Sequence, residues 1–331
     1  MGRWAEFEEK EFETLANAAL VMQQLPSPTP VQLFSPGQVL EKSLGFDFAT
    51  YIDPMGQLYR TLFGSTPGAP GIPRGFFPQH QVPRTTATSS LNVFLQYKRP
   101  LFFAQQHRSA IWPRRQEHLA FTVEERTAGA SRFAQVGSLD RLELALGSRA
   151  LVRYVCPSTW RKPDLYERFA TGRLLATSTF VAPHKLRLIG GRGYHRRWTF
   201  LDSNPRSGVP NPGGPEDDAE DGAQFGITLA EARIGPDAPH STSELLDSAT
   251  ERVSGVRESL RKYREDTDRR QFDSQEQQEK RMRGEASHFP REHRQLVEEA
   301  ISLALVARDL RTDWMVAGAA ERDIAPAQVP E

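Results

Sequence analysis

The stretch that most constrains the fold is SLNVFLQYKRP, residues 90–100, which alternates with the two-residue period of a β-strand. One face of this strand carries Asn92, Phe94, Gln96 and Lys98, and the other face carries the apolar side chains between them. Because Gln96 and Lys98 are two residues apart, we expect the amide and the ammonium group to project in the same direction. The pattern therefore predicts a strand that ends in a pair of polar groups on one face.

An acidic residue precedes this strand in a second short apolar segment, EKSLGFDF, which contains Asp47. Hydrolysis of a phosphodiester with Mg²⁺ needs hard oxygen ligands for the metal and profits from a lysine that stabilises negative charge. Asp47 on one strand, with Gln96 and Lys98 on the next, meets these needs. An amide oxygen coordinates a metal more weakly than a carboxylate, so Gln96 requires carboxylates elsewhere to supply the negative charge.

The order of the remaining elements predicts the fold class. An amphipathic helix is expected over residues 4–25, a leucine-rich helix over 138–147 and a continuously apolar strand, ALVRYVCP, over 150–157. A further helix follows at 162–175, and STFVAPHKL and RRWTFLD are expected as strands at the edge of the sheet. This order indicates an α/β fold with a mixed central β-sheet flanked by helices and a C-terminal helical region.

Composition suggests where the chain divides. Residues 203–240 begin with a Pro- and Gly-rich and then acidic stretch, which favours a linker between an α/β domain at 1–202 and a helical region at 241–331. The last helical stretch has an apolar stripe that includes Leu310 and Trp314, and this region is expected to mediate oligomerisation or docking of a partner. Residues 64–84 are crowded with Gly and Pro and predict a long irregular loop.

Charge and cysteine content exclude several classes of protein. The chain has 42 basic and 42 acidic residues, so any nucleic-acid binding has to use a local patch. The single cysteine, Cys156, excludes an intrachain disulfide and a cysteine-based zinc site, and its apolar surroundings predict a buried core residue. No stretch approaches the roughly 20 apolar residues that span a bilayer, and the first apolar segment follows acidic residues. We therefore expect a cytoplasmic protein without membrane contact.

A basic segment, HKLRLIGGRGYHRRW at 184–198, interleaves cations with aromatic residues, a combination that suits a nucleic-acid backbone and exposed bases. An equally good interpretation is the solvated edge of a hairpin that blocks pairing by its charges. The glycines at 190, 191 and 193 lack the lysine and helix of a phosphate loop and predict a hairpin turn. The candidate nucleic-acid-binding residues are Lys185, Arg187, Arg192, Arg196 and Arg197.

The N-terminal helix with its glutamates, Gly45-Phe46-Asp47, and Gln96-Tyr97-Lys98 together resemble the PD-(D/E)xK nuclease superfamily. The pattern is more similar to the Gln-x-Lys branch typified by Mrr-type restriction endonucleases, and to bacterial defence-associated proteins with the same strand. The resemblance covers roughly residues 5–200 and implies a restriction-endonuclease-like fold. It implies Mg²⁺ or Mn²⁺ as cofactor, Asp47 and Gln96 as metal ligands and Lys98 as the catalytic lysine. Glu9 or Glu13 would be the acid contributed by the helix.

Two functions remain open at this point. The first is a metal-dependent endonuclease that cleaves DNA, as the effector of a bacterial anti-phage defence system. The second is a catalytically inactive nucleic-acid-binding or scaffold subunit of a multi-protein complex that keeps the nuclease fold. Gln96 in the place of an acid is the feature that separates the two hypotheses.

Overall fold

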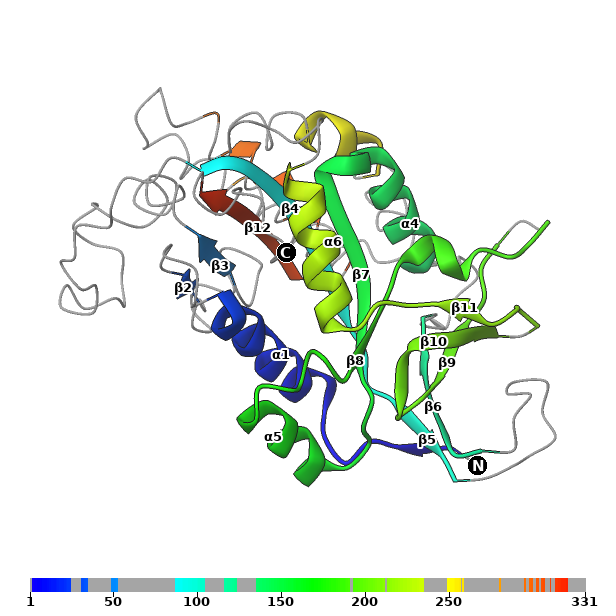
Figure 1. Cartoon of the computed structure of the whole chain (residues 1–331). Helices are drawn as coiled ribbons and strands as arrows, with labels where there is room; N and C mark the ends of the chain where they lie inside the picture. The colour runs from blue at the N-terminus through cyan, green and yellow to red at the C-terminus, as the bar shows by residue number, and fades with distance from the viewer. Residues whose placement is uncertain are drawn as a thin grey trace, which may run out of the picture.

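A computed structural model of the chain describes residues 2–24, 31–34, 49–52, 87–104, 116–123, 135–190, 193–211, 213–234, 249–256 and 313–320, with scattered positions between 258 and 310. The described part is mixed α/β, as the order of elements predicts (Figure 1). The helices are α1 (Glu9–Gln24), α4 (Gln135–Leu146), α5 (Lys162–Ala170) and α6 (Gly222–Ile234), with short 3-10 turns η2 (Gly147–Arg149) and η3 (Pro183–Leu186). The strands are β1 (Arg3–Trp4), β2 (Val31–Phe34), β3 (Ala49–Ile52), β4 (Ala87–Tyr97), β5 (Leu101–Phe103), β6 (His118–Thr122), β7 (Ala150–Pro157), β8 (Ser178–Val181), β9 (Arg197–Leu201), β10 (Asn204–Asn211), β11 (Asp217–Asp218) and β12 (Asp313–Ala320).

Two sheets make up most of the described structure. The four-stranded sheet has the order β12-β4-β7-β8, in which only β4 and β7 are parallel. The six-stranded sheet has the order β1-β5-β6-β9-β10-β11 and is antiparallel throughout. A separate hairpin pairs β2 with β3. Since three residues separate β4 from β5, the chain passes directly from one sheet into the other at Lys98–Pro100.

The predicted alternation of residues 92–98 is confirmed, because the two faces of β4 contribute to different clusters of buried residues. Val93, Leu95 and Tyr97 pack with residues of α1, α5 and α6. Phe94 packs with α4, with β7 and with the inner face of the six-stranded sheet. In Figure 1, α6 lies in front of β4 and β7. The strand that carries the Gln-x-Lys pair is therefore an interior strand covered on both sides.

Helix α1 follows from the predicted apolar stripe, although it begins at Glu9 and not at residue 4. Phe12, Ala16 and Ala19 are buried, and glutamates occupy the first turn, where the helix dipole favours negative charge. Its one buried polar side chain in the described range is Asn17, whose Oδ1 accepts a hydrogen bond from the Tyr97 hydroxyl at 2.5 Å. This bond fixes α1 against the end of β4.

Removing the Tyr97 hydroxyl tests that contact. We expect Tyr97→Phe to lower the free energy of unfolding by about 1–2 kcal/mol, because Asn17 is left with a buried acceptor that has lost this donor. Urea denaturation followed by circular dichroism measures the change. Tyr166→Phe is the matched control, since the Tyr166 hydroxyl donates to Glu11 on the exposed surface and its loss is expected to cost under about 0.5 kcal/mol. Equal effects of the two substitutions would contradict the expected role of Asn17.

Two predicted helices are confirmed, α5 from its expected start at Lys162 and α4 with a start three residues before the expected Ser138. Helix α4 begins at Gln135 and ends before Gly147, and α5 ends before Gly172. Both glycines have positive φ angles, +56° and +69°, which glycine adopts without the steric cost that a Cβ brings. The predicted hairpin turn after residue 188 is also present, since Leu188 N donates to Gly193 O and Arg187 bridges to Tyr194.

The edge position predicted for both later strands is correct for β8 and wrong for β9. Strand β8 ends the four-stranded sheet, whereas β9 lies inside the six-stranded sheet between β6 and β10. The physical reason is that Trp198 and Phe200 alternate on β9 and are fully buried against the four-stranded sheet. The charges around β9 obscure this pattern in the sequence.

Residues 204–234, assigned to a linker by composition, instead form β10, β11 and α6. Three glycines here, Gly208, Gly214 and Gly222, allow close packing. A Cβ on Gly208 would lie 2.4 Å from Nε1 of Trp198, and a Cβ on Gly222 would lie 2.5 Å from the Leu175 carbonyl carbon. A prediction from composition treats these glycines as flexible, because composition contains no information on the side chains and backbone that pack against them.

The C-terminal segment also departs from its prediction. Trp314, placed on a helical stripe by the sequence pattern, lies in strand β12, which pairs antiparallel with β4 from Asp313 to Ala320. Helical residues do precede it, and Leu303, Val306 and Leu310 are buried with the core beneath β4. The apolar residues of this segment fit both the helical period of about 3.6 and the strand period of two. Pairing with the edge of β4 favours the strand.

Within the described ranges, no helix is both long enough and apolar enough to cross a membrane. The Gly- and Pro-rich loop predicted at residues 64–84 lies outside the described residues.

Candidate functional site

The end of β4 brings Gln96 and Lys98 to a common partner, Gln135. Gln135 Nε2 donates to Gln96 Oε1 at 2.7 Å, and Lys98 Nζ donates to Gln135 Oε1 at 3.3 Å. Gln96 is 5% exposed, Lys98 8% and Gln135 4%. The two side chains therefore do point in the same direction, as the spacing predicts, and they meet in a buried polar cluster.

Gln135 is the residue of this cluster that sequence reasoning missed. It is the first residue of α4, and its Nε2 also donates to the backbone carbonyl of Leu310 at 2.8 Å. Gln135 thus joins β4, α4 and the C-terminal segment. It lies 39 residues from Gln96, and no local spacing or motif marks it. Only the packing of α4 against the four-stranded sheet, chiefly on β7, makes it part of the site.

The neighbouring strand β7 supplies the floor of the cluster. Lys98 N donates to Val155 O, and Lys98 Nζ lies 5.9 Å from the centroid of the Tyr154 ring, a cation–π arrangement. Burial raises the pKa of Tyr154 well above its ordinary value, and the nearby Asp140 carboxylate and Tyr194 raise it further. The phenol is therefore neutral across the physiological range.

Cys156 is a buried core residue, as predicted. Its pKa is raised well above the ordinary thiol value, first by burial and then by the Glu9 carboxylate, while the Lys98 ammonium acts in the opposite direction. A thiol with a raised pKa is a poor nucleophile. Both charges act on the same sulfur, so Glu9 and Lys98 both lie near the end of β7.

Of the two helix acids, the structure brings Glu9 to the strand end. Glu9 Oε2 accepts a hydrogen bond from Arg99 N at 3.3 Å, one residue beyond Lys98. Glu13 Oε1 accepts from Lys10 Nζ on its own helix at 2.6 Å. Because Glu9 is the first residue of α1, the start of the helix and the end of β4 meet at this point.

A divalent cation would need more oxygen ligands than these residues offer. Among the described residues, no group of three or more His, Cys, Asp or Glu side chains is arranged to hold a metal ion. Gln96 Oε1 is the one side-chain oxygen of the Gln-x-Lys pair, and Gln135 is bonded to it. Asp47, the expected principal ligand, lies outside the described residues. The described donor set therefore does not fit a metal by itself.

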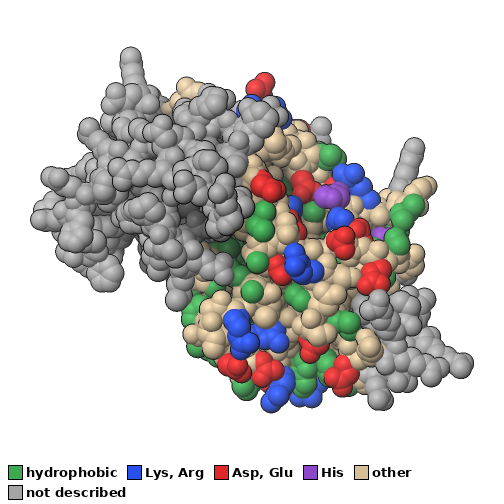
Figure 2. Space-filling model, viewed as in Figure 1, with side chains coloured by type: hydrophobic (Ala, Val, Ile, Leu, Met, Phe, Trp, Pro, Cys, Tyr) green, Lys and Arg blue, Asp and Glu red, His purple; other side chains and the backbone are tan. Residues whose placement is uncertain are grey.

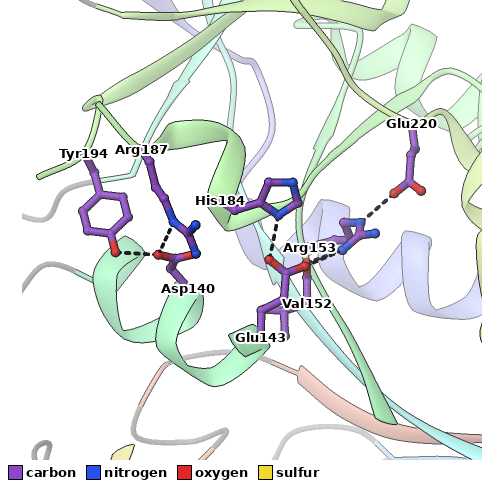
Figure 3. A network of polar contacts seen from close by, with 8 residues as sticks. All are labelled: Asp140, Glu143, Val152, Arg153, His184, Arg187, Tyr194 and Glu220. Carbon is purple, nitrogen blue, oxygen red and sulfur yellow. Dashed lines mark hydrogen bonds and ion pairs between the residues drawn. The ribbon is translucent and has the colours of Figure 1, made fainter. Parts of the chain in front are cut away.

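The basic segment at 184–198 is partly neutralised by carboxylates. Arg187 binds Asp140 through two hydrogen bonds of 2.8 and 2.7 Å, and the Tyr194 hydroxyl donates to the same carboxylate at 2.6 Å (Figure 3). Lys185 Nζ forms an ion pair with Asp217 at 2.7 Å. Two of the five candidate nucleic-acid-binding cations thus have intramolecular anionic partners. Their binding to nucleic acid stays a prediction.

The other three candidates lie apart. Arg192 is outside the described residues, and Arg196 N donates to Asn211 O in the backbone. The Arg197 guanidinium lies over the Phe103 ring at 5.6 Å from its centroid. In the view of Figure 2, acidic and basic side chains are intermixed over the described surface, in keeping with the zero net charge.

A second charged network lies on the side of β7 away from Lys98. Arg153, almost completely buried in the middle of β7, binds Glu220 at 2.6 Å and Glu143 at 2.9 Å (Figure 3). Glu143 also contacts His184 Nδ1 at 3.0 Å, and Thr228 donates to Glu220 at 2.6 Å. The network ties α4, η3 and α6 to the central strand.

The Asp140 contact predicts a loss of stability at alkaline pH. Burial and the hydrogen bond to Asp140 raise the pKa of Tyr194 from 10.0 to about 12. The folded state therefore keeps this proton where the unfolded state loses it, and the stability gained from Tyr194 falls as the pH rises from about 10 to 12. Thermal unfolding as a function of pH, for the wild type and Tyr194→Phe, measures the difference. Parallel curves for the two proteins would contradict the assignment.

No family model, no curated protein and no solved structure matches the chain.

Proposed function

We propose that the chain is a metal-dependent nuclease that hydrolyses phosphodiester bonds in DNA, with its active centre at the end of β4. The observation that carries the proposal is the convergence of Gln96 and Lys98 on one partner, Gln135. The resemblance of the sequence motif requires these two side chains to share one face of the strand. Side chains of Gln96 and Lys98 on opposite faces of the sheet would have contradicted the proposal.

Each residue has a distinct part in the proposed chemistry. The Lys98 ammonium, held over the Tyr154 ring, stabilises the negative charge that develops on the phosphate oxygens or orients the attacking water. Its low-polarity surroundings strengthen this electrostatic effect. Glu9 sits at the strand end and positions the Lys98–Arg99 backbone. Asp47 has to supply the carboxylate that the described residues lack, so no step is routed through a metal here.

Access of a substrate requires a rearrangement of Gln135. Its amide caps both Gln96 Oε1 and Lys98 Nζ, and its third contact is the Leu310 carbonyl. A change in the side-chain rotamer of Gln135 breaks its hydrogen bonds to Gln96 and Lys98 in one movement. The C-terminal segment that holds Gln135 is therefore a natural place for control of the proposed activity.

A second candidate function is supported by the same hydrogen bonds. Gln96, Lys98 and Gln135 bond to one another, and all three are nearly inaccessible to solvent. A buried polar network that is satisfied internally rigidifies a core without any chemistry. On this hypothesis the chain is a non-catalytic nucleic-acid-binding or scaffold subunit in which the pair only fixes α4 to β4.

Metal-dependent cleavage distinguishes the two candidates. The purified chain is incubated with supercoiled plasmid and with labelled single-stranded DNA in Mg²⁺, in Mn²⁺ and in EDTA. The nuclease proposal expects nicking or shortening that EDTA abolishes. Absence of cleavage in either metal, both for the chain alone and for the chain with the products of neighbouring genes, favours the non-catalytic candidate.

A further inference from the structure

The surface beside the Gln-x-Lys cluster carries aromatic rings paired with arginines. Lys98 turns into the cluster, whereas the next residue, Arg99, places its guanidinium 5.7 Å from the centroid of the Trp4 ring. Arg197 lies 5.6 Å from the Phe103 centroid, and the Phe103 ring stacks on His118 at 4.9 Å and 9°. We call Trp4, Phe103, His118, Arg99 and Arg197 the aromatic platform.

Strand register places the aromatic platform on one face of the six-stranded sheet. Phe103 is paired with His118, and Trp4 is paired with Leu101, two residues before Phe103. Directly opposed residues share a face, and so do residues two apart. Trp4 and Phe103 are therefore diagonal neighbours, which in a sheet lie roughly 7–8 Å apart. Arg197 is paired with Thr122, which shares this face with His118.

The opposite face of the same strands packs against the four-stranded sheet, and on the platform face His118, Ala120 and Thr199 are buried as well. Phe121, Trp198 and Phe200 are fully buried on that opposite face, against the four-stranded sheet. Trp4, by contrast, is 52% exposed. An exposed tryptophan on a two-residue edge strand contributes little to a core, and large exposed aromatic groups mark interaction surfaces. The exposure of the Trp4 ring is therefore not explained by packing of the core.

The charges of the platform favour an anionic partner. Burial lowers the pKa of His118, and the nearby Arg197 lowers it further, while its bond to the Gln116 carbonyl acts in the opposite direction. His118 is accordingly a neutral stacking partner at pH 7. The Arg99 guanidinium donates to Glu8 Oε2 at 2.8 Å and to the Ala5 carbonyl at 2.6 Å, and the Glu8 side chain is exposed. Arg99 lies over the Trp4 ring and Arg197 over the Phe103 ring, so both cations stand next to an aromatic side chain.

We propose that the aromatic platform binds a single-stranded nucleic acid through its unpaired bases. A base stacks on the exposed ring of Trp4, beside the Phe103 ring that His118 and Arg197 already cover, and the adjoining phosphates contact Arg99 and Arg197. Stacking on aromatic side chains beside cations is how proteins hold unpaired strands without sequence preference. Because Arg99 follows Lys98 directly in the chain, a strand on the platform leads to the Gln-x-Lys cluster. The inference rests on the proposed function only for that last step.

Binding is tested without cleavage, in EDTA, by fluorescence anisotropy of labelled 20-nucleotide oligo(dT), oligo(U) and a duplex of equal length. We expect both single strands, or one of them, to bind more tightly than the duplex. The comparison of oligo(dT) with oligo(U) then assigns DNA or RNA as the ligand. A preference for the duplex, or single-strand binding weaker than roughly 100 µM, the weak end of non-specific affinities, overturns the proposal.

Substitutions in the platform locate the binding site. Trp4→Ala is expected to weaken single-strand binding roughly five- to a hundredfold, the range for loss of one base-stacking aromatic. Tyr166→Ala is the matched control, because Tyr166 is also exposed and also has a cation over its ring, Lys162 at 5.8 Å, but stands on α5 away from the platform. Equal affinities of Trp4→Ala and the wild type overturn the proposal, provided that circular dichroism shows the variant folded.

The arginines are tested by salt dependence. Arg197→Ala is expected to reduce the slope of log affinity against log salt concentration by roughly 0.7, the value for one phosphate contact of a single strand. Glu8→Gln is expected to strengthen binding, because it removes an anion from beside Arg99. An unchanged slope and unchanged affinity in these two variants would contradict the phosphate contacts.

The outcome is separable from that of the proposed function. Lys98→Met, which lacks the proposed catalytic cation, is expected to retain single-strand binding. Binding without cleavage by the wild type leaves the platform established and removes the nuclease proposal. If instead the wild type cleaves DNA, Trp4→Ala cleaves equally well and no single-strand binding is detected, the nuclease proposal stands and the platform proposal is overturned.

Discussion

Lys98→Met is expected to lower the rate of DNA cleavage at least about a hundredfold, the effect of removing one preorganised electrostatic contact from a transition state. Methionine has a similar length and no charge, so it fills the space over the Tyr154 ring while removing the cation. It also removes the donor to Gln135 Oε1. Single-turnover cleavage of labelled DNA measures the effect, because it isolates the chemical step from product release.

Lys162→Met is the matched control for this prediction. Lys162 is an exposed lysine on α5 that is paired with Glu11 at 2.7 Å. Its removal is expected to leave the cleavage rate within about a factor of two, since exposed ion pairs contribute little. A folded Lys98→Met protein that cleaves at the wild-type rate would remove Lys98 from the active centre, whatever the origin of the cleavage.

Arg153→Met is expected to lower the free energy of unfolding by about 3–5 kcal/mol, the cost of leaving buried partners of an ion pair uncompensated. Glu220 and Glu143 both bind this guanidinium, and the Glu143 and Glu220 side chains are only 18% and 19% exposed. Without Arg153, two carboxylates face each other across β7 with little solvent to screen them. Urea denaturation at pH 7 measures the loss.

Two further variants make the Arg153 result specific. Arg173→Met removes an arginine from an exposed pair with Glu167 at 3.1 Å and is expected to cost under about 0.5 kcal/mol. In the background of Arg153→Met, changing Glu143 and Glu220 to glutamine removes the uncompensated charges and is expected to restore much of the stability. A loss below about 1 kcal/mol for Arg153→Met would show that the network contributes nothing beyond surface pairing.

Local signals predicted the elements that depend on neighbours in sequence. The two-residue alternation identified β4, the continuous apolar run identified β7, and glycines ended α4 and α5 at the expected residues. Side-chain direction in a strand and the backbone freedom of glycine depend only on a few neighbouring residues, so the sequence alone is enough to predict these elements. The linker predicted from glycine and proline content was wrong, because a glycine such as Gly208 allows the close approach of Trp198.

Long-range partners were beyond any local signal. An arginine in the middle of ALVRYVCP demands buried carboxylates, yet nothing in the sequence shows that Glu220, 67 residues away, supplies one. The aromatic platform is also assembled from separate segments, since Trp4, Arg99 and Arg197 meet through the pairing of β1, β5, β6 and β9.

The sequence by itself determined that Gln96 and Lys98 project from the same face of one strand, because side chains two residues apart in a strand always do. Only the tertiary structure decided what they meet there. The packing of α4 against the four-stranded sheet brings Gln135 to both side chains, and the C-terminal segment holds Gln135 through the Leu310 carbonyl. Which distant amide caps a strand end depends on how helices pack over a sheet, and packing is a property of the whole chain and not of the strand.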